Sequence, residues 1–217
     1  MTLAIFDLDH TLLDGDSDVL WGQFLGEQGL VDAREHEREN LRYFDLYKSG
    51  NLDIYEFLRF QFSFLATHDL ESLHRWRHRF IDEKVRPVVL PRALDLLREH
   101  RGRGHTLLIV TATNRFITEP IAALLGVDNL IATEPEMRDG RYTGGVCGVP
   151  SFAAGKVTRV RQWIGERGLD LTDSWFYSDS HNDLPLLREV RQPVAVDPDD
   201  LLRAEALKND WPVISLR

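Results

Sequence analysis

The chain has 217 residues, with 35 Asp and Glu against 26 Lys and Arg, which gives a formal net charge of −9. This length suits one core domain with an insertion, and the acidic balance argues against nucleic acid or an anionic membrane as a partner. The only cysteine, Cys147, excludes a disulfide framework and a cysteine metal site. The sequence shows no signal-peptide pattern and no apolar run of membrane-spanning length, so we expect a soluble, cytoplasmic protein.

The first predicted element is a short buried strand, the apolar run Leu3–Phe6. It is followed at once by the motif Asp7-Leu8-Asp9-His10-Thr11. Two carboxylates, those of Asp7 and Asp9, therefore leave the carboxyl end of a strand, where open α/β sheets bind their ligands. Taken alone, these two acids are equally well explained as turn residues.

Residues 15–86 carry a helical pattern of apolar side chains throughout, with no strand among the helices. Gly29 is a typical helix end, and Asp53 and Asp69 are typical residues at a helix start. We therefore predict an all-helical cap domain over residues 15–86, inserted into a core made of residues 1–14 and 87–217. Its aromatic side chains are interpreted mainly as the core of the helical bundle, with a ligand pocket as the alternative.

The rest of the chain alternates between strand and helix patterns. This alternation predicts an α/β fold, a Rossmann-like parallel sheet with helices on both faces. The expected helices cover 91–100, 119–125 and 155–167, the expected strands cover 105–110, 130–132, 174–177, 193–196 and 211–214, and a hairpin over 138–146 turns at Asp139-Gly140.

Polar clusters stand at three further places near this sheet edge. They are Thr111-Ala112-Thr113-Asn114 after one strand, Lys156 at a helix start, and Ser178-Asp179-Ser180-His181-Asn182-Asp183 after another strand. Each has a simple structural explanation by itself, as a helix cap or a surface lysine. Together they bring four or more carboxylates to one edge, where their repulsion requires a cation. Oxygen-only ligands favour Mg²⁺.

With these four motifs in order, the chain resembles the haloacid dehalogenase superfamily over nearly its whole length. The helical insertion after the first motif is similar to the cap of its phosphoserine-phosphatase-like branch. The pair Gly155-Lys156 and the run from Asp179 to Asp183 are similar to that branch as well.

The resemblance implies a Mg²⁺-dependent phosphatase that acts through an aspartyl-phosphate. Asp7 would be the nucleophile and Asp9 the general acid and base. Mg²⁺ would be bound by Asp7, the Asp9 carbonyl and Asp179, with Asp183 one shell further out. The phosphate would be bound by Thr111, Ala112, Lys156 and Asn182. The partner would be a small phosphomonoester, and His10 and His181 receive no role.

The cap gives the expectation for the substrate. Asp16 occupies the place of an acid that meets the substrate's ammonium group in phosphoserine phosphatases, although it is equally well explained as a helix cap. Those enzymes also use a cap arginine for the substrate carboxylate, and Gln61 stands at that place here, while Arg59 would point to another face. We therefore expect an amino-alcohol phosphate, with histidinol phosphate first. Phosphoserine hydrolysis, phosphotransfer to an alcohol and a non-catalytic phosphate-binding protein are the alternatives.

Overall fold

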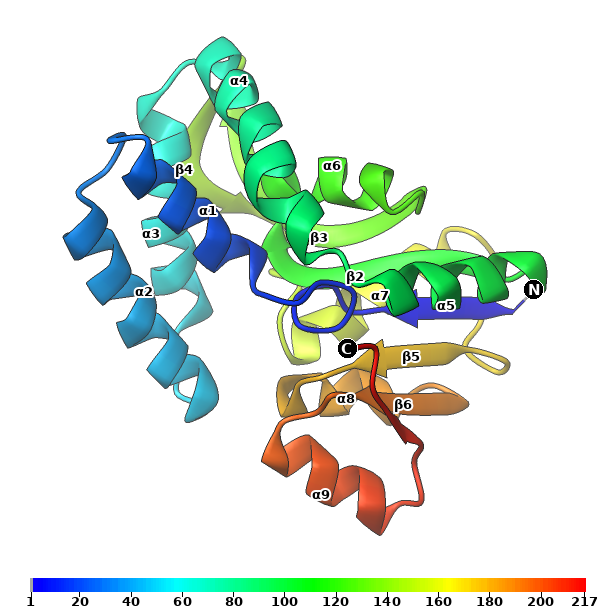
Figure 1. The fold of residues 1–217 in the computed structure, drawn as a ribbon. Coiled ribbons are helices and arrows are strands. Elements are labelled where there is room, and N and C mark those ends of the chain that lie inside the picture. Colours follow the sequence, from blue (N-terminus) through cyan, green and yellow to red (C-terminus); the bar gives the residue numbers. More distant parts are fainter. Residues whose placement is uncertain (1) are drawn as a thin grey trace.

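The computed structural model describes residues 2–217. These residues form a seven-stranded sheet in the order β4-β3-β2-β1-β5-β6-β7, with β1 in the middle (Figure 1). Neighbouring strands are parallel, apart from the antiparallel pair β3 and β4. The strands are β1 (Leu3–Phe6), β2 (Thr106–Asn114), β3 (Asn129–Arg138), β4 (Arg141–Cys147), β5 (Trp175–Ser178), β6 (Gln192–Val196) and β7 (Val213–Ile214).

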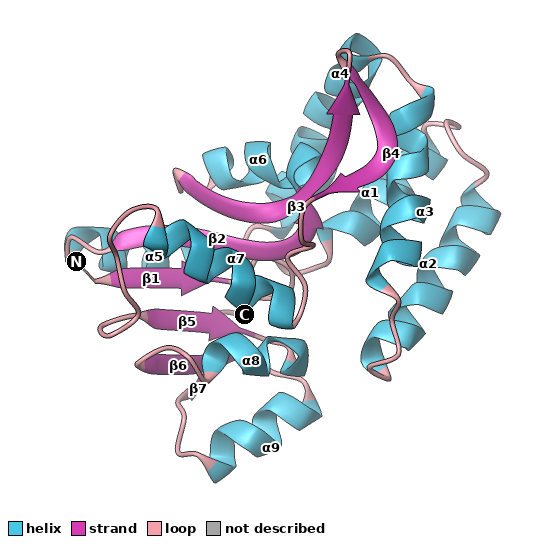
Figure 2. Cartoon of the chain, turned by 180° about the vertical axis from the view of Figure 1, so that it is seen from behind, coloured by secondary structure: helices cyan, strands magenta, loops and turns pink. Residues whose placement is uncertain are grey.

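Helices cover both faces of this sheet (Figures 1 and 2). Because side chains alternate along β1, Phe6 packs on one face and Ile5 on the other, in two separate apolar clusters. Helices α5 (Pro91–Gly102) and α6 (Arg115–Leu124) pack on the face of Phe6, and α7 (Ala154–Gly165), α8 (Leu184–Leu187) and α9 (Asp200–Lys208) pack on the face of Ile5. The predicted α/β fold is confirmed.

Between β1 and α5 the chain forms four consecutive helices that lie together at one end of the sheet (Figure 1). They are α1 (Ser17–Glu27), α2 (Ala33–Lys48), α3 (Ile54–Thr67) and α4 (Leu70–Phe80). Each begins after an aspartate whose side chain accepts a backbone N–H of the first turn, namely Asp16, Asp32, Asp53 and Asp69. A π-helical turn (Ile81–Val85) and a 3₁₀ turn (Arg86–Val88) then return the chain to the sheet.

Aromatic side chains fill the interior of these helices. Trp21 makes edge-on contacts with Phe64 and Phe80, and all three are buried. The interpretation of the aromatics as bundle core is therefore right for these residues. Phe44 and Phe57 instead line the cavity described below, as the alternative supposed.

The hairpin of β3 and β4 is longer than the sequence indicated. Asp139 and Gly140 form its turn, both with positive φ (48° and 74°), as predicted. The strand expected over 130–132 continues to Arg138 because its second half, although polar, pairs with β4 rather than with β2. The other strand of the hairpin, β4, packs against α3, and the Cβ position of Gly144 lies 3.5 Å from Ala66. The sheet and the helical insertion therefore share an interface on this side.

Strand β2 also extends further than predicted. Instead of ending at Val110 it runs to Asn114, with a register irregularity between these two residues. The polar run beginning at Thr111 is thus part of the strand, and Asn114 caps α6. The predicted edge strand near the end of the chain is present as β7. None of the helices in residues 2–217 combines the length and apolar character needed to cross a membrane.

Candidate active site

A cavity of about 610 Å³ lies between the carboxyl ends of the central strands and helices α2 and α3. Strands β1, β2 and β5 are neighbours and parallel, so the residues that follow them meet at one edge. All residues predicted for the site line this cavity: Asp7, Asp9, Asp16, Thr111, Ala112, Lys156, Asp179, Asn182 and Asp183. The structure brings the predicted residues together, and their individual roles stay predictions.

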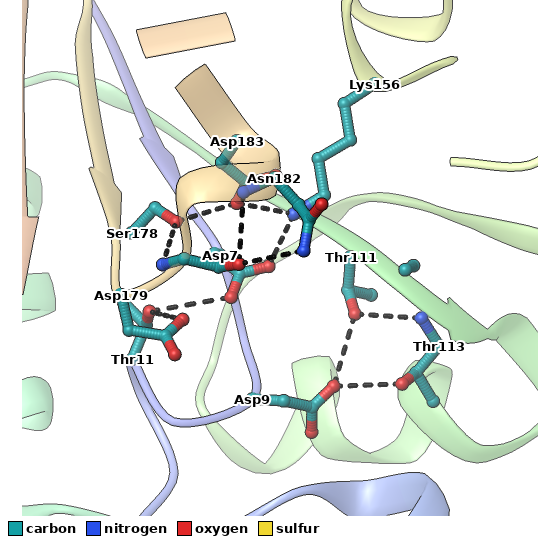
Figure 3. Close-up of polar contacts among 12 residues, drawn as sticks. Asp7, Asp9, Thr11, Thr111, Thr113, Lys156, Ser178, Asp179, Asn182 and Asp183 are labelled. Atoms are coloured by element: carbon teal, nitrogen blue, oxygen red, sulfur yellow. Dashed lines mark hydrogen bonds and ion pairs between the residues drawn. The ribbon is translucent and has the colours of Figure 1, made fainter. Parts of the chain in front are cut away.

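Lys156 lies at the centre of the site, buried between two carboxylates (Figure 3). Its Nζ is 2.7 Å from Oδ1 of Asp7 and 2.8 Å from Oδ2 of Asp183, and the Ser178 hydroxyl donates to the same oxygen of Asp183 at 2.7 Å. Burial alone would lower the pKa of Lys156, but the charges of Asp183 and Asp7 outweigh it, so this pKa is raised. The lysine remains an ammonium cation.

Just before Lys156, the backbone at Gly155 passes very close to the backbone of the preceding loop. A Cβ on Gly155 would lie 2.1 Å from the carbonyl oxygen of Pro150, so only glycine fits there. Ala153, which precedes α7, has a positive φ of 48°. The start of α7 is thereby placed close to the preceding loop, and Lys156 in its first turn reaches Asp7.

Asp7 and Asp179 lie on either side of the Thr11 hydroxyl. This hydroxyl is 3.2 Å from Oδ1 of Asp179 and 3.5 Å from Oδ2 of Asp7. Burial raises the pKa of Asp7 to about 7, against the lowering effect of Lys156. Burial, followed by the charges of Asp7 and Asp183, also raises the pKa of Asp179. Near neutral pH these buried carboxylates favour an additional cation.

The donor set fits Mg²⁺. Within the described chain no three His, Cys, Asp or Glu side chains gather as a metal cluster, because the expected crowd of carboxylates is divided. Asp183 is paired with Lys156, while Asp7 and Asp179 face each other through Thr11. Mg²⁺ usually takes one or two carboxylates and keeps several waters, so Asp7 and Asp179 are a sufficient side-chain set.

Asp9 lies on another side of the cavity, within a separate network (Figure 3). Its Oδ1 accepts the backbone N–H of Ser17 at 2.7 Å, and its Oδ2 accepts the hydroxyl of Thr113 at 2.9 Å and that of Thr111 at 3.4 Å. Asp9 is thus held apart from the lysine pair and faces open cavity space.

Two residues of the Asp9 network were missed by the sequence interpretation. Thr113 and Asp18 are buried and joined by a hydrogen bond of 3.2 Å. In the sequence, Asp18 belongs to the acidic run at the start of α1, and Thr113 belongs to the polar run after Val110. Burial, followed by the charges of Asp16 and Asp9, raises the pKa of Asp18 well above its ordinary range. No local pattern identifies this pair, because the two residues come from different elements.

Asp16 is both a helix cap and a cavity residue, the two positions that its sequence context allowed. Its Oδ1 caps α1 by accepting the Val19 N–H at 2.9 Å, and the residue also lines the cavity. Burial, followed by the charge of Asp9, raises the pKa of Asp16 to about 6. Its assignment to a substrate ammonium stays a prediction.

The two other cap positions singled out from the sequence differ in placement. Gln61 lines the cavity and its side-chain amide donates to Asn40 at 3.3 Å, whereas Arg59 is exposed and faces away from it. His10 and His181 also line the cavity, and Nδ1 of His181 is 2.7 Å from Oδ2 of Asp199.

Comparison with known proteins shows which family the chain belongs to. Residues 4–188 match the family model of the haloacid dehalogenase-like hydrolases. The chain belongs to this family. A histidinol-phosphatase of Neisseria meningitidis serogroup C is 45% identical over 99% of both chains, and a probable phosphatase of Mycobacterium tuberculosis is 32% identical over 99% of this chain and 75% of its own length.

Solved structures share this fold. A protein of unknown function from Bordetella pertussis has a TM-score of 0.94 at 45% identity, covering 100% of this chain and 99% of its own. A phosphoserine phosphatase, solved as a phospho-aspartyl intermediate analogue, has a TM-score of 0.70 at 21% identity over 99% of this chain and 93% of its own, a likeness of fold alone. The expected family and the class of enzyme, a phosphatase of the haloacid dehalogenase type, are confirmed.

Proposed function

We propose that this haloacid dehalogenase-like hydrolase is a Mg²⁺-dependent phosphatase of small amino-alcohol phosphates, with histidinol phosphate as the favoured substrate. One observation carries the proposal. Asp7 and Asp9 line one cavity and are separated in sequence by Leu8 alone, but Asp7 is paired with buried Lys156 while Asp9 is held in a separate network. Two carboxylates in different surroundings suit two different roles, nucleophile and acid–base.

In the first step, an Asp7 oxygen attacks the phosphorus, and the bond from phosphorus to the substrate's alcohol oxygen breaks. Asp9 gives its proton to that leaving oxygen, a contribution of roughly 10²- to 10⁴-fold to such reactions. The Lys156 ammonium stabilises charge on Asp7 and on the transferred phosphoryl group. Thr111, Ala112 and Asn182 would bind the phosphoryl oxygens.

In the second step, water attacks the phosphorus of the aspartyl-phosphate while Asp9 takes a proton from it. The bond from phosphorus to Asp7 breaks, so both carboxyl groups return to their starting states. Mg²⁺, held by Asp7, the Asp9 carbonyl and Asp179 with Asp183 further out, would neutralise charge between the nucleophile and the phosphate.

The chemistry of the cavity supports an amine-bearing substrate. Asp16 and Asp18 lie on its wall next to Asp9, and burial raises the pKa of Asp16 to about 6. An ammonium group beside Asp16 would favour the charged form of this carboxyl group. The neutral Gln61, which also lines the cavity, occupies the place where an arginine would pair with a substrate carboxylate.

The same cavity offers aromatic surface for a planar group. Its lining includes the half-buried rings of Phe44, Tyr47, Phe57 and Phe152. Such rings stack well on an imidazole. The 45% identical histidinol-phosphatase of Neisseria meningitidis supports the same choice of substrate.

The test is a phosphate-release assay on purified protein with Mg²⁺, using histidinol phosphate, phosphoserine and phosphoethanolamine. We expect the highest kcat/KM for histidinol phosphate and loss of activity with EDTA. Faster turnover of phosphoserine would overturn the substrate assignment, and no release from any phosphomonoester would overturn the proposed function. Repeating the assay with an acceptor alcohol separates hydrolysis from phosphotransfer, because transfer gives a new phosphate ester.

A further inference from the structure

The hydroxyl of Thr113 lies between two carboxyl oxygens. It is 2.9 Å from Oδ2 of Asp9, a usual hydrogen-bond distance, and 3.2 Å from Oδ2 of Asp18, a longer hydrogen bond. A hydroxyl has one hydrogen and can donate to only one of these oxygens. The other oxygen is then the donor to the hydroxyl, so at least one of the two carboxyl groups carries a proton.

The contacts at the start of α6 show which carboxyl group this is. Oδ1 of Asn114 accepts the Ile117 N–H at 3.2 Å as the cap of α6, which fixes the orientation of its amide. The amide nitrogen of Asn114 therefore donates to Oδ1 of Asp18, also at 3.2 Å. With Oδ1 accepting, the free position for a proton on Asp18 is Oδ2, the oxygen that faces Thr113.

The surroundings of Asp18 agree with a neutral group. Asp18 is 6% exposed, and no ion pair is found for it within residues 2–217, while Asp9 and Asp16 place negative charge nearby. A buried carboxyl group without a cation favours its protonated form. Asp9, by contrast, accepts a backbone N–H from Ser17 and faces the cavity.

We infer that Asp18 and Thr113 are positioning residues for Asp9: neutral Asp18 donates to the Thr113 hydroxyl, which in turn donates to Oδ2 of Asp9. With the Ser17 N–H on Oδ1, this fixes the plane of the Asp9 carboxyl group. The direction of the whole chain of hydrogen bonds is set by the cap of α6. The inference rests on the proposed function, in which Asp9 protonates the leaving oxygen.

The first test compares leaving groups. The kcat/KM value reports formation of the aspartyl-phosphate, in which an alkyl alcohol needs a proton from Asp9 and p-nitrophenolate needs little or none. We expect Thr113→Val to lower kcat/KM for histidinol phosphate by about tenfold or more, part of the effect of a general acid, and to lower it much less for p-nitrophenyl phosphate. Thr113→Ser, which keeps the hydroxyl, should restore most of the loss.

A matched control removes another buried hydroxyl. Thr118 is also buried and donates to the Asn114 carbonyl rather than to a carboxylate, so Thr118→Val should affect both substrates equally. Equal loss on both substrates in Thr113→Val, or no loss at all, would overturn the inference. If the wild type released phosphate from neither substrate, the proposed function itself would fail, and the stability test below would still decide the state of Asp18.

The second test needs no activity. Asp18→Asn keeps an acceptor for Asn114 and supplies an N–H donor to Thr113, so it reproduces the neutral acid. At pH 7.5 its Tm should equal or exceed that of the wild type, whereas Asp18→Ala should melt lower. An ionised Asp18 would accept both hydrogen bonds, and Asp18→Asn would then lower Tm as Asp18→Ala does. That result would overturn the inference.

Discussion

The phenol oxygen of Tyr47, on α2, lies 2.6 Å from the hydroxyl oxygen of Ser180, in the loop after β5. This hydrogen bond joins the helical insertion to the sheet directly over the cavity. The Tyr47 ring also packs against Phe152, with 6.0 Å between the ring centroids. We propose that residues 15–86 act as a cap over the core and that this contact helps to hold the cap closed.

Replacing Tyr47 with Phe tests this contact. A neutral hydrogen bond contributes about 0.5–1.5 kcal/mol, which corresponds to a factor of roughly 2 to 12 in an equilibrium constant. We expect Tyr47→Phe to raise KM by such a factor with a smaller change in kcat, because the closed form becomes less populated. Tyr55→Phe is the control, since Tyr55 is exposed on α3 and outside the cavity. An unchanged KM in steady-state assays of Tyr47→Phe would speak against the closing role.

Lys156 should contribute to stability as well as to catalysis. Removing one partner of a buried ion pair leaves its carboxylates uncompensated and costs about 3–5 kcal/mol. We expect Lys156→Met to lower the free energy of unfolding by this order, measured by urea denaturation without metal. Lys84→Met, which breaks the more exposed pair with Glu27, should change it by less than about 1 kcal/mol. Similar values for the two variants would contradict the buried position of Lys156.

Asp7 should destabilise the metal-free protein above neutral pH. Its pKa rises from 3.8 unfolded to about 7 folded, so stability is lost as pH increases from 4 to 7. At pH 8 without metal, Asp7→Asn should therefore have a Tm equal to or above that of the wild type while losing activity. Asp183 still pairs with Lys156 in this variant.

Added Mg²⁺ provides the complementary measurement. At a hundred times Kd, a ligand stabilises the folded state by about 2.7 kcal/mol. The wild type should therefore gain more in Tm from Mg²⁺ than Asp7→Asn does. An equal gain in both proteins would place the cation away from Asp7.

The buried His100 should make stability depend on pH in the acidic range. Its Nε2 is 2.8 Å from the Tyr177 hydroxyl and its Nδ1 is 2.8 Å from Nδ1 of His105. Burial, followed by the charge of His105, lowers the pKa of His100 from 6.5 to about 4. Between these values the imidazole binds more protons in the unfolded chain, so the contribution of His100 to stability increases with pH by up to about 3 kcal/mol, opposite in sign to the contribution of Asp7.

The measurement is denaturation at several pH values between 4 and 7.5. Between pH 4 and 6.5 the unfolding free energy of the wild type should increase relative to that of His100→Gln, since the opposite contribution of Asp7 is present in both proteins. His78→Gln is the control, because the His78 side chain is 84% exposed and should leave the slope unchanged. Parallel pH profiles for the wild type and His100→Gln would refute the assignment.

Gln61 offers a test of substrate choice. A guanidinium group in its place would pair with a substrate carboxylate across the cavity. We expect Gln61→Arg to raise kcat/KM for phosphoserine relative to histidinol phosphate by about tenfold or more, equivalent to roughly 1.4 kcal/mol. Ser63→Arg adds the same charge on the exposed side of α3 and should leave the ratio unchanged. If the ratio of kcat/KM for phosphoserine to that for histidinol phosphate changed equally in both variants, the added positive charge alone would explain the change, and position 61 would have no specific role.

Much of the fold follows from local patterns in the sequence. The apolar run of β1, the aspartate caps at Asp53 and Asp69, and the positive-φ turn at Asp139-Gly140 are decided by a few neighbouring residues. Parallel strands then place the residues after them at a common edge, so the gathering of Asp7, Thr111 and Asp179 was predictable. The polar half of β3 was not, because only its pairing with β4 makes it a strand.

The hydrogen bonds that distinguish the two carboxylates of the first motif were decided by the tertiary structure alone. Asp18 meets Thr113 across 95 residues of chain, and Tyr47 meets Ser180 across 133. Such contacts depend on how helices and strands pack, to within an ångström or less, and no spacing in the sequence encodes that distance. The sequence by itself determined which chemical groups reach the cavity; packing decided which of them are neutral, which are charged, and which hold another in place.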